Sequence, residues 1–163
     1  MQVLVADTSV LVDLDRAGLL EKAFDCGLTL IVPDMLYEQE LAEHNGPYLR
    51  KLGLGVVALS SLEVQLAQDI KRGRTGLSWP DSFALSCAHR DEHVLVSGDR
   101  TLRSEATKRL GVVYGLLWIL DNMEKSGHVD AKGLHDGLSA IVAHPTCRLP
   151  RDEVASRLAK WAI

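Results

Sequence analysis

Short runs of β-branched and aliphatic residues alternate, over the first 115 residues, with stretches whose apolar positions recur at helical spacing. Each run is bounded by polar or turn-forming residues, and this pattern is typical of short buried strands. The runs predict strands at residues 2–6, 29–32, 55–59, 93–97 and 112–114.

The segments between these runs predict amphipathic helices. Leu62, Leu66 and Ile70 mark one apolar helical face, and Phe83 and Cys87 mark another. Helices that alternate with aliphatic strands indicate βαβ units, and βαβ units form a parallel sheet. The predicted fold class is therefore α/β with a central parallel sheet.

The strand pattern stops after residue 115, and the remaining chain reads as helical. Helices are predicted at 116–124, 130–143 and 151–161, and Pro145 and Pro150 separate the last two. This tail is too short to bury a core of its own, so we expect it to pack on the sheet or on a partner. The chain is accordingly predicted to be a single domain over 1–163, with a core at about 1–120 and a helical C-terminal extension at about 116–163.

Four short segments each supply one carboxylate to what the topology predicts to be a single place. Asp7 and Asp99 each follow a predicted strand, whereas Asp81 and either Glu38 or Glu40 lie near the starts of helices. Ligands of open α/β sheets bind at the carboxyl ends of the strands. Two unpaired charges ~4 Å apart repel each other by about 4 kcal/mol at an effective dielectric constant of ~20. A divalent cation removes this cost, so the sequence predicts a site for a hard ion such as Mg²⁺ or Mn²⁺.

Composition narrows the classes of function. The formal net charge is −4, so any nucleic acid must be bound through a local basic patch or through a bridging metal ion. The three cysteines are scattered and form no CxxC motif, which indicates a reducing compartment. The sequence has no signal-peptide pattern and no apolar stretch approaching the ~18 residues of a membrane span. We therefore expect a cytoplasmic protein without a membrane partner.

The four acidic segments, taken in order, resemble the motifs of the PIN domain family. The first is DTSVL, beginning at Asp7, and the second is a glutamate within PDMLYEQEL. The third is WPDSFAL, containing Asp81, and the fourth is SGDR, containing Asp99. Each motif alone is weak, but all four occur in the family's order, and the resemblance covers about residues 1–120. The tail is similar to the C-terminal extensions of some bacterial toxin-like PIN proteins.

This resemblance implies a three-layer α/β/α fold and a divalent-metal-dependent nuclease that most often cuts single-stranded RNA. Many bacterial members are VapC-like toxins held inactive by an antitoxin, so an antitoxin is an expected partner. PIN-like toxins commonly pair, and the apolar run at 116–120 also suggests a homodimer. Two alternatives remain: a PIN-like nuclease of RNA processing or DNA metabolism without an antitoxin, and a catalytically silent module that binds nucleic acid.

The resemblance also implies which acids bind metal and carry catalysis. These are Asp7, Asp81, Asp99 and one glutamate of the second motif. Glu38 and Glu40 point about 200° apart on an α-helix, so only one of them can face the metal. We favour Glu38, because it shares a face with apolar residues that can pack on the sheet, but Glu40 stays open as the alternative.

Residues beside these acids are candidates for substrate binding. The hydroxyls of Thr8 and Ser9 can donate to a carboxylate, a water or a phosphate, and Arg100 and Arg103 can contact phosphate. Family members often carry a further acid just after the fourth motif. Here the next acid is Glu105, which leaves open whether the site holds one metal ion or two.

Overall fold

The computed structural model describes residues 2–162 and has a four-stranded, all-parallel sheet at its centre. The strands are β1 (Val3–Ala6), β2 (Thr29–Pro33), β3 (Gly55–Val57) and β4 (His93–Val96). Their order across the sheet is β3-β2-β1-β4. The predicted α/β class with a parallel sheet is confirmed.

The fifth predicted strand, at 112–114, is not formed. Only a single parallel bridge joins Val96 to Tyr114. The Tyr114 N–H donates to the Leu95 carbonyl, and the Ser97 N–H donates to the Tyr114 carbonyl, both at 3.0 Å. The next helix begins two residues later, at Leu116, so the chain leaves the sheet before a strand can develop.

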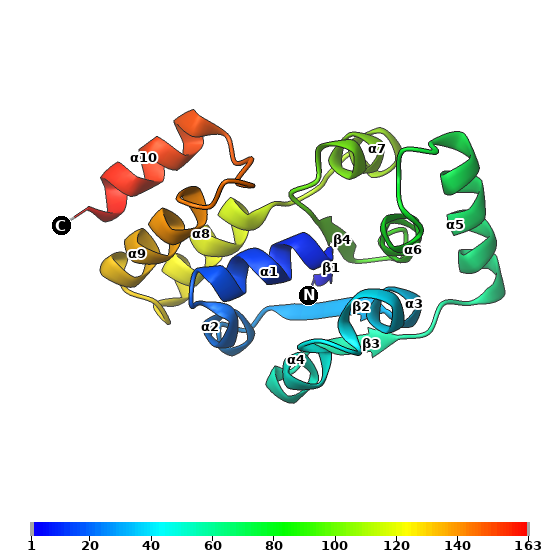
Figure 1. The fold of residues 1–163 in the computed structure, drawn as a ribbon, viewed down its shortest axis with the longest axis horizontal. Helices are drawn as coiled ribbons and strands as arrows, with labels where there is room; N and C mark the ends of the chain where they lie inside the picture. Colours follow the sequence, from blue (N-terminus) through cyan, green and yellow to red (C-terminus); the bar gives the residue numbers. More distant parts are fainter. Residues whose placement is uncertain (1, 163) are drawn as a thin grey trace.

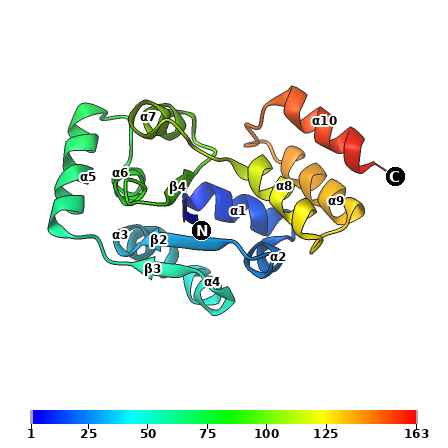
Figure 2. The same ribbon diagram turned by 180° about the vertical axis from the view of Figure 1, so that it is seen from behind.

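Helices cover the sheet and extend beyond one end of it (Figures 1 and 2). Those before β4 are α1 (Thr8–Arg16), α2 (Leu20–Asp25), α3 (Asp34–Leu36), the π-helix η1 (Tyr37–Leu41), α4 (Gly46–Leu52), α5 (Ser61–Gly73) and α6 (Trp79–Cys87). Those after it are α7 (Arg100–Leu110), α8 (Leu116–Ser126), α9 (Ala131–Val142) and α10 (Arg151–Trp161). Helix α6 packs on β1, β2 and β4 and carries α5 on its outer side. No helix within residues 2–162 is long and apolar enough to cross a membrane.

The C-terminal helices pack on the rest of the chain. Helices α8 and α9 lie against α1, and α10 packs on α9, as the group at the left of Figure 1 shows. One cluster of buried apolar side chains extends from Leu4 to Trp161. Leu116, Leu117 and Leu120 are buried within this single chain. Apart from the half-buried Trp118, the apolar run at 116–120 is therefore used up within the chain, and the prediction of a homodimer keeps the resemblance as its main basis.

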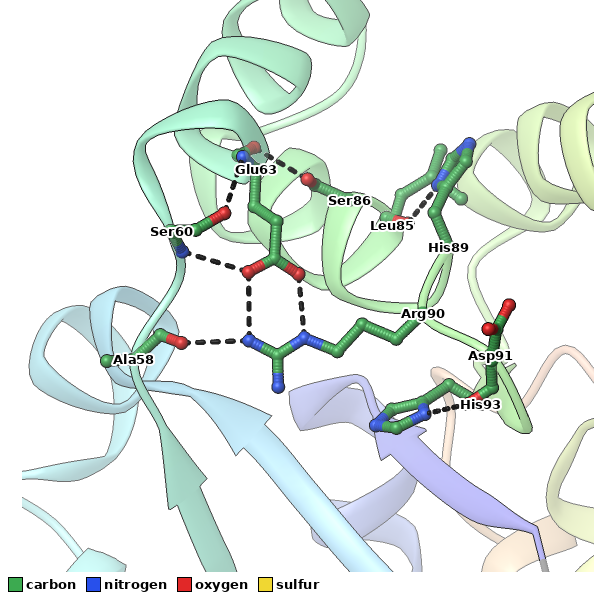
Figure 3. A network of polar contacts seen from close by, with 9 residues as sticks. All are labelled: Ala58, Ser60, Glu63, Leu85, Ser86, His89, Arg90, Asp91 and His93. Atoms are coloured by element: carbon green, nitrogen blue, oxygen red, sulfur yellow. Dashed lines mark hydrogen bonds and ion pairs between the residues drawn. The ribbon is translucent and has the colours of Figure 1, made fainter.

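An ion pair between Arg90 and Glu63 holds α5 and α6 together (Figure 3). Arg90 donates to both carboxylate oxygens of Glu63, at 2.7 and 2.9 Å, and also to the Ala58 carbonyl at 2.8 Å. Ser86 of α6 donates to the Glu63 carbonyl at 2.6 Å. The Arg90 guanidinium is the main reason that the pKa of Glu63 is lowered to about 2. The pair joins the start of α5 to the chain that follows α6.

Candidate active site

Asp7 lies at the point where the strand order reverses. The chain adds β2 and then β3 on one side of β1, and β4 pairs on the other side. Such a switch point leaves a crevice at the carboxyl ends of the two strands that flank it, here β1 and β4, where open α/β sheets bind their ligands. Ala6 pairs with Val96 at the ends of β1 and β4, so Asp7 and Ser97 leave the sheet side by side.

Ser97 links two of the predicted acids. Its side chain is fully buried, and its Oγ donates to Asp7 Oδ2 at 2.9 Å and accepts from the Asp99 N–H at 3.0 Å. Ser9 Oγ donates to the same Asp7 oxygen at 2.9 Å. Two hydroxyl donors therefore hold the Asp7 carboxylate in one orientation, with its other oxygen, Oδ1, left free of both donors.

Asp81 and Asp99 are fixed at the starts of helices. The Asp99 side chain caps α7, because its Oδ1 accepts from the Leu102 N–H at 2.8 Å. Asp81 and Ser78 form a capping box at the start of α6, in which Asp81 Oδ2 accepts from the Ser78 N–H at 3.3 Å. Both carboxylates benefit from the positive end of a helix dipole. The capping roles and a role in binding do not exclude each other, since each cap uses one oxygen of its carboxylate.

Glu40, and not Glu38, accompanies these aspartates. Thr8 Oγ1 donates to Glu40 Oε1 at 2.8 Å, whereas Glu38 is exposed. The second motif forms a π-helix in which the Ala42 N–H donates to the Tyr37 carbonyl at 2.8 Å. Such wide turns are frequent at functional sites.

The packing of this segment favours Glu40 over the predicted Glu38. The register that favoured Glu38 puts Met35 and Leu41 on the packed face, and Leu41 is buried there but Met35 is exposed. Leu36 and Tyr37 are buried instead, and these residues share their face with Glu40. Burial of the large Tyr37 ring determines which side of this segment faces the protein.

Asp7, Glu40, Asp81 and Asp99 line one cavity of about 500 Å³. Each uses one carboxylate oxygen in the hydrogen bonds described above. The second oxygen of each accepts no hydrogen bond from residues 2–162. Four carboxylates from four separate segments thus belong to residues that line a common space, and each has one oxygen that accepts no hydrogen bond within residues 2–162.

The electrostatics of this acid cavity are unfavourable to the ionised form of its acids. Burial, above all, raises the pKa of Asp7, and the charges of Glu40 and Asp99 raise it further, while the hydroxyls of Ser97 and Ser9 lower it. Burial also raises the pKa of Asp81, followed by the charge of Asp7. The chain tolerates repulsion here that a bound cation would relieve.

The donor set fits a hard divalent cation. Within residues 2–162, no group of three or more Asp, Glu, His or Cys side chains is gathered closely enough to hold an ion as the side chains lie. Mg²⁺, however, keeps several of its waters and needs only one or two protein carboxylates in direct contact. Carboxylates around a cavity of this size suit a hydrated ion. Among the residues that line the cavity, Cys147 of the tail is the one soft ligand of the kind that selects other metals.

The other predicted site residues divide between two cavities. Thr8 and Ser9 line the acid cavity, whereas Arg100 and Arg103 line a neighbouring groove. Arg103 Nη1 donates to the carbonyls of Ser97 and Tyr114, at 2.7 and 3.0 Å, so this arginine fixes the chain around the fourth motif. Arg103 is therefore less available to contact phosphate than the sequence predicted.

Glu105, the next acid after the fourth motif, does not join the acid cavity. It is buried and paired with Arg109 at 2.9 Å and with Arg74 at 3.2 Å. Arg109, followed by Arg74, lowers its pKa, so it serves as the anion of a structural ion-pair network.

Sequence reasoning missed the contribution of the tail to this site. Residues Thr146 to Leu149, from the segment between α9 and α10, form one wall of the acid cavity. Arg16 of α1 donates to Thr146 at 3.4 Å and also contacts Asp13. No motif in this loop of the tail indicates that it lies beside the acid cavity. The role of Ser97 was also missed, although its position in the SGDR motif is a signal from which it could have been predicted.

Comparison with known proteins assigns the family. No curated protein and no solved structure matches the chain significantly. The family model DUF3368, described as a PIN domain, matches residues 3–162. PIN domains are generally nucleases, and these nucleases generally use divalent metal ions. Because the match spans almost the whole sequence, including the tail that walls the acid cavity, the chain belongs to the PIN domain family.

Proposed function

We propose that this protein is a divalent-metal-dependent endoribonuclease that cuts single-stranded RNA at the acid cavity. The observation that carries the proposal is the convergence of Asp7, Glu40, Asp81 and Asp99 on one cavity at the switch point of the sheet. Nuclease activity follows the family, and the choice of single-stranded RNA follows the resemblance of the four motifs.

In this proposal, one carboxylate is the principal metal ligand and the other three complete the site. Asp7 is the principal holder of the ion, because two hydroxyl donors and burial fix its direction. Asp99 and Asp81 contribute from the ends of α7 and α6, and Glu40 contributes from η1. When bound, Mg²⁺ or Mn²⁺ supplies Lewis acidity toward the phosphodiester and lowers the pKa of a bound water.

The remaining chemistry belongs to the chain itself. Thr8 orients Glu40 by donating to its Oε1, and Oε2 accepts no hydrogen bond within residues 2–162. Ser97 connects the Asp7 carboxylate to the backbone N–H of Asp99, so one buried hydroxyl holds the two segments against each other. A rigid array of this kind favours a fixed position of the attacked phosphate, and fixed geometry is a large part of catalysis in phosphoryl transfer.

A substrate panel tests this proposal. Equal amounts of single-stranded RNA, double-stranded RNA and single-stranded DNA of the same mixed sequence are incubated with the protein and Mn²⁺. We expect internal cuts in the single-stranded RNA at the highest rate. Faster cutting of DNA would replace the proposed substrate with that of a nuclease of DNA metabolism. Tight binding of RNA without any cleavage would favour the silent binding module.

A toxin role is the finer form of the proposal, and the resemblance of the tail to toxin-like extensions supports it. Induced expression of the parent chain in a bacterial host should arrest growth, and Asp7→Asn should relieve the arrest. Co-expression of the product of a small neighbouring reading frame should also relieve it. Normal growth under strong expression of an active nuclease would instead favour a role in RNA processing.

A further inference from the structure

A second cavity, of about 800 Å³, adjoins the acid cavity. It lies between the chain after β4, the start of α8 and the tail segment that leads into α10. Gly98, Cys147, Arg148 and Leu149 line both cavities, so the two spaces meet at these residues. A ligand in the second cavity can therefore continue into the first.

This second cavity, which we call the arginine groove, is lined by five arginines and two acids. Arg157 is committed to Asp121, with hydrogen bonds of 2.9 and 2.7 Å to its two carboxylate oxygens. That pair, together with the contacts of Lys160 and Trp161 with Glu124, fastens α10 to α8.

Three arginines of the groove remain available. Arg100, Arg148 and Arg151 are exposed, and none of them forms an ion pair or a side-chain hydrogen bond within residues 2–162. Three unpaired guanidinium groups are a local positive excess on a chain whose formal net charge is −4. Such a patch is the expected footprint of a polyanion, and the fork of a guanidinium matches a phosphate.

Two aromatic residues line the same groove. Tyr114 and Trp118 stack on each other with ring centroids 4.1 Å apart and an interplanar angle of 9°. Aromatic side chains beside a basic groove are the common means of holding unpaired bases. An acidic protein segment would use the arginines but would gain less from this aromatic pair.

We propose that the arginine groove holds the backbone of the RNA strand next to the cut, with Arg148 at the junction and Arg100 and Arg151 along the groove. This inference rests on the proposed function and deepens it, because it assigns substrate positioning to the C-terminal tail. The tail thus supplies binding residues to a catalytic site built from the first hundred residues.

Binding is tested without cleavage, by fluorescence anisotropy of a short fluorescein-labelled single-stranded RNA in the presence of chelator. The groove variant is Arg148→Ala/Arg151→Ala. The matched control is Arg72→Ala/Lys108→Ala, which removes the same charge from exposed residues that line neither cavity. Thermal melts check that both variants fold, which their exposure leads us to expect.

We expect the groove variant to weaken RNA binding at least about tenfold and to reduce the slope of log affinity against log salt by about 1.4, the value for two lost contacts to single-strand phosphates. The control should bind within about twofold of the parent. Equal binding by groove variant and parent would overturn the inference. Displacement of RNA by polyglutamate more readily than by unlabelled RNA would also overturn it, in favour of an acidic protein partner.

The failure of this inference differs from the failure of the proposed function. Groove-dependent binding without metal-dependent cleavage would refute the nuclease and leave the groove assignment standing. Cleavage by the parent, with RNA affinity and cleavage both unchanged in the groove variant, would refute only the groove assignment.

Discussion

The two glutamates of the second motif give the sharpest test of the site, because they differ in position and not in chemistry. Glu40 lines the acid cavity and accepts from Thr8, whereas Glu38 is two residues away, exposed, and absent from the cavity lining. The change in each case is Glu→Gln, which removes one negative charge and keeps the size of the side chain.

The expected effect on activity is large for Glu40→Gln alone. If Glu40 is one of four carboxylates that hold the ion, its replacement should lower kcat/KM at least about 100-fold, equivalent to about 2.7 kcal/mol of transition-state stabilisation. Glu38→Gln should stay within about twofold of the parent, because its charge lies outside the cavity.

The expected effect on stability is small for both. The amide oxygen introduced by Glu40→Gln still accepts from the Thr8 hydroxyl, and the loss of the charge weakens this bond by about 0.5–1 kcal/mol. The loss of repulsion toward Asp7 acts in the opposite direction. The net change should lie within about 1 kcal/mol, which corresponds to about 2–4 °C in Tm for a chain of this length.

The assay is cleavage of an end-labelled single-stranded RNA under saturating Mn²⁺, with thermal melts of the same samples in chelator. Equal losses of activity in the two variants would refute the assignment of Glu40, as would a larger loss in Glu38→Gln. A loss in Glu40→Gln accompanied by a Tm well below that of the parent would mean that Glu40 acts through the fold.

Three further predictions concern single groups. Asp7→Asn should abolish cleavage, but in chelator at pH 7 its Tm should equal or exceed that of the parent. The pKa of Asp7 is raised in the fold, so its ionised form lowers stability above that pKa, and the difference in Tm should disappear as the pH falls toward the ordinary value of 3.8. Ser97→Ala should cost about 1–3 kcal/mol in urea denaturation, because it removes a buried donor to Asp7, and should raise the pKa of Asp7 further; an unchanged midpoint would contradict this. Arg90→Met should cost about 1–2 kcal/mol at pH 7, allowing for partial solvent screening. Because Arg90 lowers the pKa of Glu63 to about 2, the stability it provides is fully present above about pH 4.5 and is lost toward pH 2, so urea midpoints of variant and parent should converge over that range.

The parts of the fold that repeat a local pattern could be predicted from the sequence. Aliphatic runs mark the four strands, and parallel pairing follows from the helices between them. The places of Asp7 and Asp99 follow directly, since each comes just after a strand whose end is fixed by the sheet. The strand predicted at 112–114 does not form, because an aliphatic run gives only a tendency to form a strand and here the chain turns into α8 at Leu116.

The parts of the site that depend on packing could not be predicted. The choice between Glu38 and Glu40 depends on a π-turn and on burial of Tyr37, and neither has a signature in helical periodicity. The wall formed by Arg148 and its neighbours depends on how α10 docks on α8 and α9, a long-range arrangement invisible to local patterns. The local sequence pattern therefore predicts the acids that follow strands, whereas tertiary packing determines which further residues line the acid cavity with them.

The most direct measurement of the central claim is the rate of RNA cleavage through removal and return of the metal ion. Purified parent chain is incubated with end-labelled single-stranded RNA in Mn²⁺, then with excess chelator, then with Mn²⁺ restored in excess of the chelator. Asp7→Asn, prepared in parallel, excludes a contaminating nuclease. The account predicts internal cleavage that stops with chelator and resumes with Mn²⁺ in the parent, and no cleavage at any stage in Asp7→Asn. Cleavage that continues in chelator, or equal cleavage by Asp7→Asn, would contradict a carboxylate-held metal centre at the switch point of the sheet.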